Sequence, residues 1–203
     1  MKKTGIDKAT KRAAAATTAL ESANAATNYD EFEAAWAQFL VAGNAVHTIL
    51  EVAARDCPTS RQWFGQKKKI QRKDPLLCYM HQARNADEHG IEPTTTLEPG
   101  GLSIGATGAG VHIKSLTIDE RGHLSVDATP IGDGRMLVSV SPARPRLNIV
   151  CDNRYGTEFE PPTFHLDEPL QNTSPLAVGS IWLNYLEGLL LEASERADRT
   201  RTA

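Results

Sequence analysis

This 203-residue chain lacks several features that would assign it quickly to a functional class. Its three cysteines form no CxxC pair, so they do not form a zinc motif of standard spacing and cannot all pair in disulfides. No apolar run is long enough to cross a bilayer, and no apolar stretch follows the charged start of the chain. The sequence also contains no GxSxG, HExxH or Walker-type motif. We therefore expect a cytoplasmic protein without a membrane segment, metal site or cofactor.

A large excess of charge of one sign is missing as well. The chain carries 22 basic and 25 acidic residues, for a net charge of −3. This balance excludes bulk nucleic-acid binding of the histone kind and leaves room for a local basic patch. A hydrophobic content of 40% is enough for a packed core, and the length suits one domain or a bundle plus a small second module.

The first ninety residues carry the three-and-four spacing of apolar residues that is typical of amphipathic helices. One stripe is mostly alanine and the next is bulky, which favours an antiparallel helical hairpin. Asn28, followed three residues later by Glu31, predicts the cap between the two helices. The stripes consist of Ile6, Ala9, Ala13, Ala16, Leu20 and Ala23, then Phe32, Trp36, Phe39, Gly43, Val46, Leu50 and Ala53.

Two more helix starts follow in the sequence. Thr59 with Gln62 offers a cap after Cys57-Pro58, and Asp74-Pro75 offers another with proline at the first helical position. Gly90 and Pro93 then end the helix that Asp74 begins.

The composition changes from Gly90 onwards. Residues 90–110 are rich in Gly, Thr and Pro and are expected to form loop, whereas the alternating runs 111–118 and 123–128 predict a β-hairpin. Residues 136–140 and 146–150 predict two further strands, and 152–162 predict turns. Ser174-Pro175 starts a last helix whose apolar residues cover more than one face, so we expect it to return to the bundle.

The predicted fold class is therefore α+β, with an N-terminal antiparallel helical bundle, a small antiparallel β module and a C-terminal helix packed on the bundle. The predicted domains are 1–90 for the bundle, 91–170 for the β module, which is expected to be an insertion, and 171–203 for the closing helix and a polar tail.

The segment Arg84-Asn85-Ala86-Asp87-Glu88-His89 is the most informative part of the chain. Arginine can hold a phosphate, and histidine exchanges protons near neutral pH, which is what phosphodiester cleavage without a metal requires. Asn85 and His89 share a helix face, and His81 lies on the same stripe one turn earlier. The competing interpretation is an ordinary charged surface at the end of a helix.

This segment resembles the Arg-polar-x3-His signature of the HEPN superfamily, and the resemblance extends over the helical hairpin and the motif helix but not over residues 101–168. The resemblance implies a metal-independent endoribonuclease of the toxin, stress or defence effector type, with Arg84, Asn85 and His89 as catalytic residues. It also implies RNA as the substrate, a homodimer with the site at its interface, and an antitoxin or regulatory protein as a further partner.

One dense basic run precedes the motif helix. Its residues Lys67, Lys68, Lys69 and Arg72 either form a solvated helix face or, together with His81, bind the phosphates of the substrate. The alternative to an enzyme is a non-catalytic, HEPN-like dimeric module that binds a protein or ligand.

Overall fold

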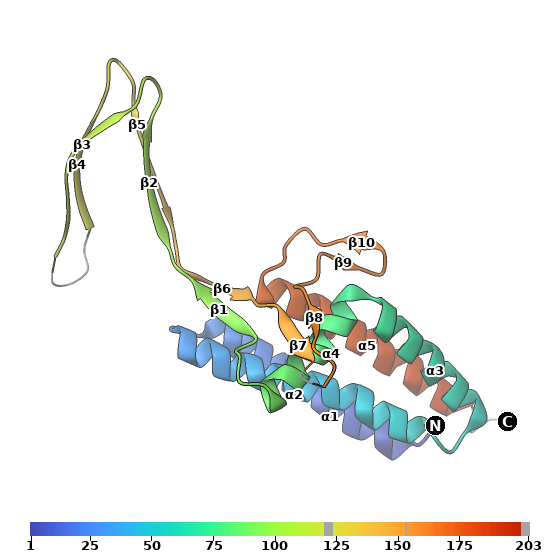
Figure 1. Cartoon of the computed structure of the whole chain (residues 1–203). Helices are drawn as coiled ribbons and strands as arrows, with labels where there is room; N and C mark the ends of the chain where they lie inside the picture. Colours follow the sequence, from blue (N-terminus) through green and yellow to red (C-terminus); the bar gives the residue numbers. More distant parts are fainter. Residues whose placement is uncertain (120–123, 153, 200–203) are drawn as a thin grey trace. The chain divides into compact units, whose positions relative to one another are not determined.

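The computed structural model describes residues 1–119, 124–152 and 154–199, without the side chains of His89, Asp198 and Arg199. The chain divides into two compact units, coloured along the sequence in Figure 1. The helical unit comprises Met1–Thr96 and Pro145–Ala203, and the strand unit comprises Leu97–Arg144. The strand unit is thus inserted into the helical unit.

The helical unit is built on the predicted antiparallel hairpin. The backbone N–H of Lys2 donates to the carbonyl of Ala53, so the start of α1 lies beside the end of α2. Every residue of the two predicted stripes is buried, which confirms the spacing argument. The helices are α1 (Lys3–Ala25), α2 (Tyr29–Ala54), α3 (Pro58–Lys73), α4 (Pro75–His89) and α5 (Pro175–Arg199).

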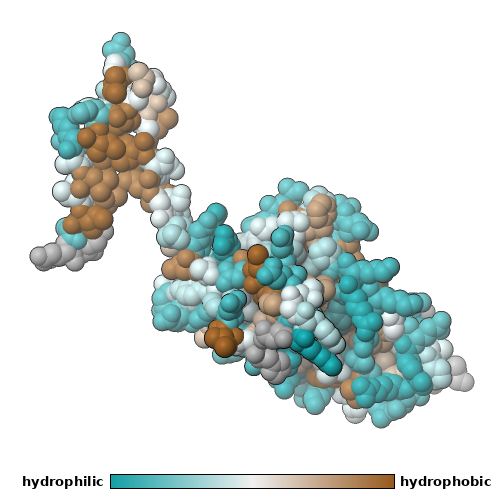
Figure 2. All heavy atoms as spheres, in the orientation of Figure 1, coloured by the Kyte–Doolittle hydropathy of each residue, from teal (hydrophilic) through white to brown (hydrophobic). Residues whose placement is uncertain are grey.

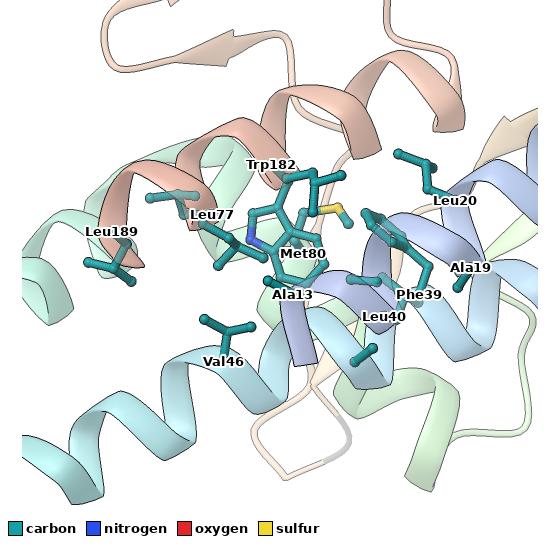
Figure 3. Packing of buried hydrophobic residues seen from close by; sticks show 14 of the residues in the cluster. Ala13, Ala19, Leu20, Phe39, Leu40, Val46, Leu77, Met80, Trp182 and Leu189 are labelled. Carbon is teal, nitrogen blue, oxygen red and sulfur yellow. The ribbon is translucent and has the colours of Figure 1, made fainter. Parts of the chain in front are cut away.

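The last helix returns to the bundle, as the sequence predicted. Trp182 of α5 packs over Gly43 of α2, where a Cβ atom would lie only 2.4 Å from the indole ring. The Trp182 ring also meets Phe39 edge-on, with 5.3 Å between ring centroids. Figure 3 shows this packing together with Leu77 and Met80 of α4.

Two of the predicted helix caps are present. The side-chain oxygen of Asn28 accepts from the N–H of Glu31 at 2.9 Å, and the Glu31 carboxylate accepts from the N–H of Thr27 rather than from that of the cap residue. At the start of α4, the Asp74 carboxylate accepts from the N–H of Leu77 at 2.8 Å. Both caps satisfy N–H groups that have no partner inside the helix.

The predicted cap at Thr59 is wrong. Cys57 is the cap residue of α3 and Pro58 is its first helical residue, so Thr59 already lies inside the first turn. The reason is that proline fits the first helical position, where no N–H is required.

Asp74 also joins the second segment of the helical unit, Pro145–Ala203, to the start of α4. Its carboxylate accepts from the N–H of Leu166 at 2.6 Å and lies 3.0 Å from the His165 ring nitrogen. Tyr79 of α4 donates its hydroxyl to the carbonyl of Asn148 at 2.7 Å. These contacts explain why residues after 145 belong with the helices, whereas the sequence placed the end of the β module at 170.

The strands form five pairs in the described part of the chain. The predicted hairpin of 111–118 is confirmed, and its partner strand runs to residue 130. The pairs are β1 (Thr95–Glu98) with β6 (Arg144–Leu147), β2 (Gly101–Ala106) with β5 (Met136–Ser141), β3 (Val111–Ile118) with β4 (Leu124–Pro130), β7 (Val150–Asp152) with β8 (Thr157–Phe159), and β9 (Phe164–His165) with β10 (Glu168–Pro169).

Two segments expected to be loop or turn contain strands. Residues 90–110 include β1 and β2, and 152–162 include β8. The glycine-rich β2 has weak strand propensity of its own, and its pairing with the β-branched and aliphatic residues of β5 outweighs that local preference.

The expectation that no segment is long and apolar enough to cross a membrane is not met: among the described residues one helix, α2, passes by length and composition. More than half of its apolar window is buried against other parts of the chain, as in the core helix of a bundle.

Candidate functional site

A pocket of about 340 Å³, most of whose lining residues are polar, lies between α2, α3 and α4. Its volume falls at the lower end of the range for small-ligand sites. We call it the α2–α4 pocket. Its lining consists of Asn44, His47, Thr48, Glu51, Phe64, Lys68, Gln71, Arg72, Cys78, His81 and Gln82. Three of the predicted substrate-binding residues, His81, Lys68 and Arg72, are therefore brought together on one surface.

The orientation of the His81 ring follows from its neighbour Asn44. The Asn44 amide nitrogen donates to the carbonyls of Leu40 and Met80, each at 3.2 Å. Its oxygen is therefore the acceptor that lies 3.2 Å from Nδ1 of His81. Nδ1 must carry a proton to make this bond, so the neutral ring keeps its Nε2 lone pair for another proton.

The protonation of His81 is shifted by its surroundings. Partial burial of the ring lowers the pKa of His81, and the nearby cations of Arg84 and Lys68 lower it further. Near neutral pH the ring is therefore uncharged and can accept a proton. His81 combines a defined tautomer with the charge state that a general base requires.

A second histidine lines the same pocket from α2. Burial lowers the pKa of His47 to about 4, and its ring stacks on Tyr185 with 6.1 Å between centroids. Within the described residues, neither ring nitrogen of His47 has a hydrogen-bond partner. A buried polar group without a partner is costly for the fold.

The basic run is divided between two faces of α3. Lys68 points to α2, where its ammonium lies 3.0 Å from the Glu51 carboxylate. Lys67 instead pairs with Glu192 of α5 at 2.6 Å. Lys69 is exposed and does not line the pocket.

Trp63 explains where Lys67 lies. The Trp63 ring is buried, its indole nitrogen donates to Glu192 at 2.9 Å, and the Lys67 ammonium lies 6.0 Å from its centroid. Lys67 is thus part of the contact between α3 and α5. Only Lys68 and Arg72 of the run face the pocket.

The motif residues lie on the last turns of α4. Arg84 is half-buried, forms an ion pair with Glu88 one turn on, and donates to the Asn85 side-chain oxygen at 3.2 Å. The Asn85 amide in turn donates to Gln82, a pocket residue, at 3.3 Å. His89 is the last residue of the helix, and its side chain lies outside the described part of the structure.

Sequence reasoning missed the contribution of α2 to this site. Asn44, His47 and Thr48 interrupt an otherwise apolar stretch between Leu40 and Leu50, and the first two are buried. Polar residues at buried positions of an apolar helix are a usable signal, because burying them requires partners. In the described residues, no group of three His, Cys, Asp or Glu side chains is placed to hold a metal ion.

No protein-family model, curated protein or solved structure matches this chain.

Proposed function

We propose that this protein is a HEPN-like, metal-independent endoribonuclease that binds RNA at the α2–α4 pocket and the adjoining end of α4. The observation that carries the proposal is the arrangement of His81. Its neutral ring, with the tautomer set by Asn44, lies on one pocket surface with Lys68 and Arg72 and one turn before Arg84. The family resemblance adds a toxin, stress or defence effector role and a site shared by two copies.

The reaction is attack by a ribose 2′-hydroxyl on the adjacent phosphodiester. The 2′-oxygen bonds to phosphorus and the 5′-oxygen leaves, which yields a cyclic phosphate and a 5′-hydroxyl end. His81 accepts the 2′-hydroxyl proton at Nε2, and His89, through the family resemblance, returns a proton to the 5′-oxygen.

Arg84 is the residue that stabilises charge on the phosphoryl oxygens. In the free protein Glu88 and Asn85 hold its guanidinium, and a substrate phosphate takes the place of the Glu88 carboxylate as the anionic partner. Asn85 keeps the guanidinium oriented during this exchange. Lys68 and Arg72 bind neighbouring phosphates and add affinity that depends on salt and not on sequence.

Cleavage of short RNA oligonucleotides in EDTA tests the catalytic assignment. We expect His81→Gln, Arg84→Gln and His89→Gln each to reduce cleavage by a factor of about 100 or more. Lys69→Gln, at an exposed position outside the pocket, is the control and should cut like the natural protein. Melting temperatures should change little, because Arg84 and His81 are not core residues. A pure natural protein that cuts no RNA would refute the enzymatic proposal.

The salt dependence of RNA binding separates the two faces of α3. The logarithm of the RNA-binding constant decreases with the logarithm of the salt concentration. We expect Lys68→Gln and Arg72→Gln each to make this slope less negative by roughly 0.7, the value for one phosphate contact with a single strand. Lys67→Gln should leave the slope unchanged and lower the stability instead, because this lysine pairs with Glu192. Equal slopes for all three variants would mean that Lys68 and Arg72 do not contact phosphates and belong to a solvated helix face.

One observation favours a second function, that of a non-catalytic ligand-binding module. His47, whose ring nitrogens have no hydrogen-bond partner among the described residues, lines a pocket that would suit a small ligand with hydrogen-bonding groups and a negative charge. Calorimetry with mononucleotides distinguishes the two functions. Binding that depends on His47 and Arg72, without cleavage of any RNA, would support the module.

A further inference from the structure

The β3–β4 ribbon of the strand unit has one apolar face. Its register places Ile118 opposite Leu124 and Leu116 opposite Val126, with Ile113 opposite Ala128. Ile113 and Leu116 are three residues apart and would point to opposite faces of a regular strand. An irregularity in the register between Ile113 and Ser115 returns them to the same face. Six apolar residues therefore lie on one face of the ribbon, although the irregularity interrupts the pairing between its two strands.

The β2–β5 ribbon repeats this design. Leu102 pairs with Val140 and Ile104 with Val138, whereas the residue between them, Ser103, pairs with Ser139. One face is therefore apolar, and the other is mixed, with Ser103, Ser139 and Leu137. In Figure 2 the hydrophobic residues of the strand unit gather into a patch over both ribbons.

The apolar faces are not covered by the chain itself. None of the described residues in the strand unit is buried, and large aliphatic side chains remain between 42% and 72% exposed. On the apolar faces these are Ile113, Leu116, Ile118, Leu124, Val138 and Val140; Leu137 lies on the opposite face of β5, and Ile131 follows β4. An isolated two-stranded ribbon is at best marginally stable in water, and it needs further strands or a packed face. The ribbons therefore require a partner.

We propose that the partner is a second copy of this chain, whose strand unit packs its apolar ribbon faces against those of the first. The six exposed aliphatic side chains on these faces offer roughly 650 Å² of surface, which lies at the lower end of what each partner contributes to an interface of standard size. A copy related by two-fold symmetry presents the same apolar faces, so the contact is self-complementary.

The charge of the strand unit agrees with this partner. Residues 97–144 contain five acidic and four basic residues, so their net charge is −1. A nearly neutral unit with uncharged apolar faces does not attract nucleic acid or a strongly charged protein. Association through these faces depends on apolar burial and should be insensitive to salt.

Sedimentation of the full chain at micromolar concentration tests the proposal. We expect a dimer for the natural protein and a monomer for the double variant Leu116→Asp with Val138→Asp, with a dissociation constant raised about a hundredfold or more. The control double variant, Thr117→Asp with Ser139→Asp, places the same charges on the opposite faces of the two ribbons and should remain a dimer. Helical circular dichroism should be the same for all three proteins.

Amide hydrogen exchange provides a readout that does not depend on the variants. Amides of β3 and β4 should be protected at concentrations where the natural protein is a dimer and should exchange quickly after dilution to the monomer. A natural protein that is monomeric would overturn the proposal. The apolar faces would then be covered by another protein or by a lipid surface. A dimer that the apolar-face variant retains would also overturn it, because the contact would then lie elsewhere.

Discussion

At the scale of single residues, His47 gives a clear pH dependence of stability. Burial lowers its pKa from 6.5 to about 4 in the folded protein, so between these values the unfolded chain binds a proton that the folded chain does not. The contribution of His47 to the free energy of unfolding is therefore unaffected above pH 6.5 and falls as the pH decreases towards 4. The total loss is on the order of 3 kcal/mol.

The variant His47→Phe tests this prediction by chemical denaturation at neutral and at acidic pH. Phenylalanine keeps the stacking on Tyr185 and does not titrate. We expect the stability of the natural protein to decrease more steeply with acid than that of the variant. Parallel curves would mean that His47 has an ordinary pKa and is not buried as described.

His81 gives the corresponding prediction for activity. Its lowered pKa keeps the ring neutral at neutral pH, so the acid limb of the cleavage profile should lie below the ordinary range of histidine. The pH–rate profile of the natural protein measures this directly. Replacing Lys68 with Gln removes one of the cations that lower the pKa and should move the acid limb towards neutral pH.

At the scale of elements, the contact between α2 and α5 depends on a glycine. We expect Gly43→Ala to destabilise the protein by about 1–3 kcal/mol, because the added methyl group would overlap the Trp182 indole. Gly65→Ala in the middle of α3 is the matched control. Nothing lies within 4 Å of its added Cβ, so the better helix propensity of alanine should stabilise by up to about 1 kcal/mol. Thermal unfolding should therefore show a lower melting temperature for Gly43→Ala and a higher one for Gly65→Ala.

At the scale of the whole molecule, the helical unit should fold without the strand unit. The N–H of Asn148 donates to the carbonyl of Thr94 at 3.0 Å, and the Thr96 hydroxyl donates to the Asn148 side chain at 2.8 Å. The chain therefore leaves and re-enters the helical unit at neighbouring points, which a short turn can join.

We expect a chain with residues 97–144 replaced by Asn-Gly to keep its helical circular dichroism and to melt within a few degrees of the natural protein. The physical reason is that the buried core consists of residues from the helical unit. Loss of cooperative unfolding in the shortened chain would show that the strand unit stabilises the helices. A shortened chain that folds and is monomeric would agree with dimerisation through the ribbons.

The sequence by itself determined the parts of this protein that depend on local spacing. The alanine stripe of α1, the bulky stripe of α2 and the caps at Asn28 and Asp74 each act within a few residues, so their pattern is visible without a fold. The α3–α4 region is the intermediate case. The basic run is evident from the sequence. That Lys67 contacts α5 and Lys68 contacts α2 depends on where those two helices lie in the fold.

Only the tertiary structure decided the composition of the candidate site. Asn44 and His47 join His81 because α2 packs beside α4, and the tautomer of His81 follows from an amide 37 residues away. The pairing of β2 with β5 likewise joins segments whose local preferences did not predict it. Long-range contacts of this kind are chosen by the packing of the whole chain, and no window of neighbouring residues contains them.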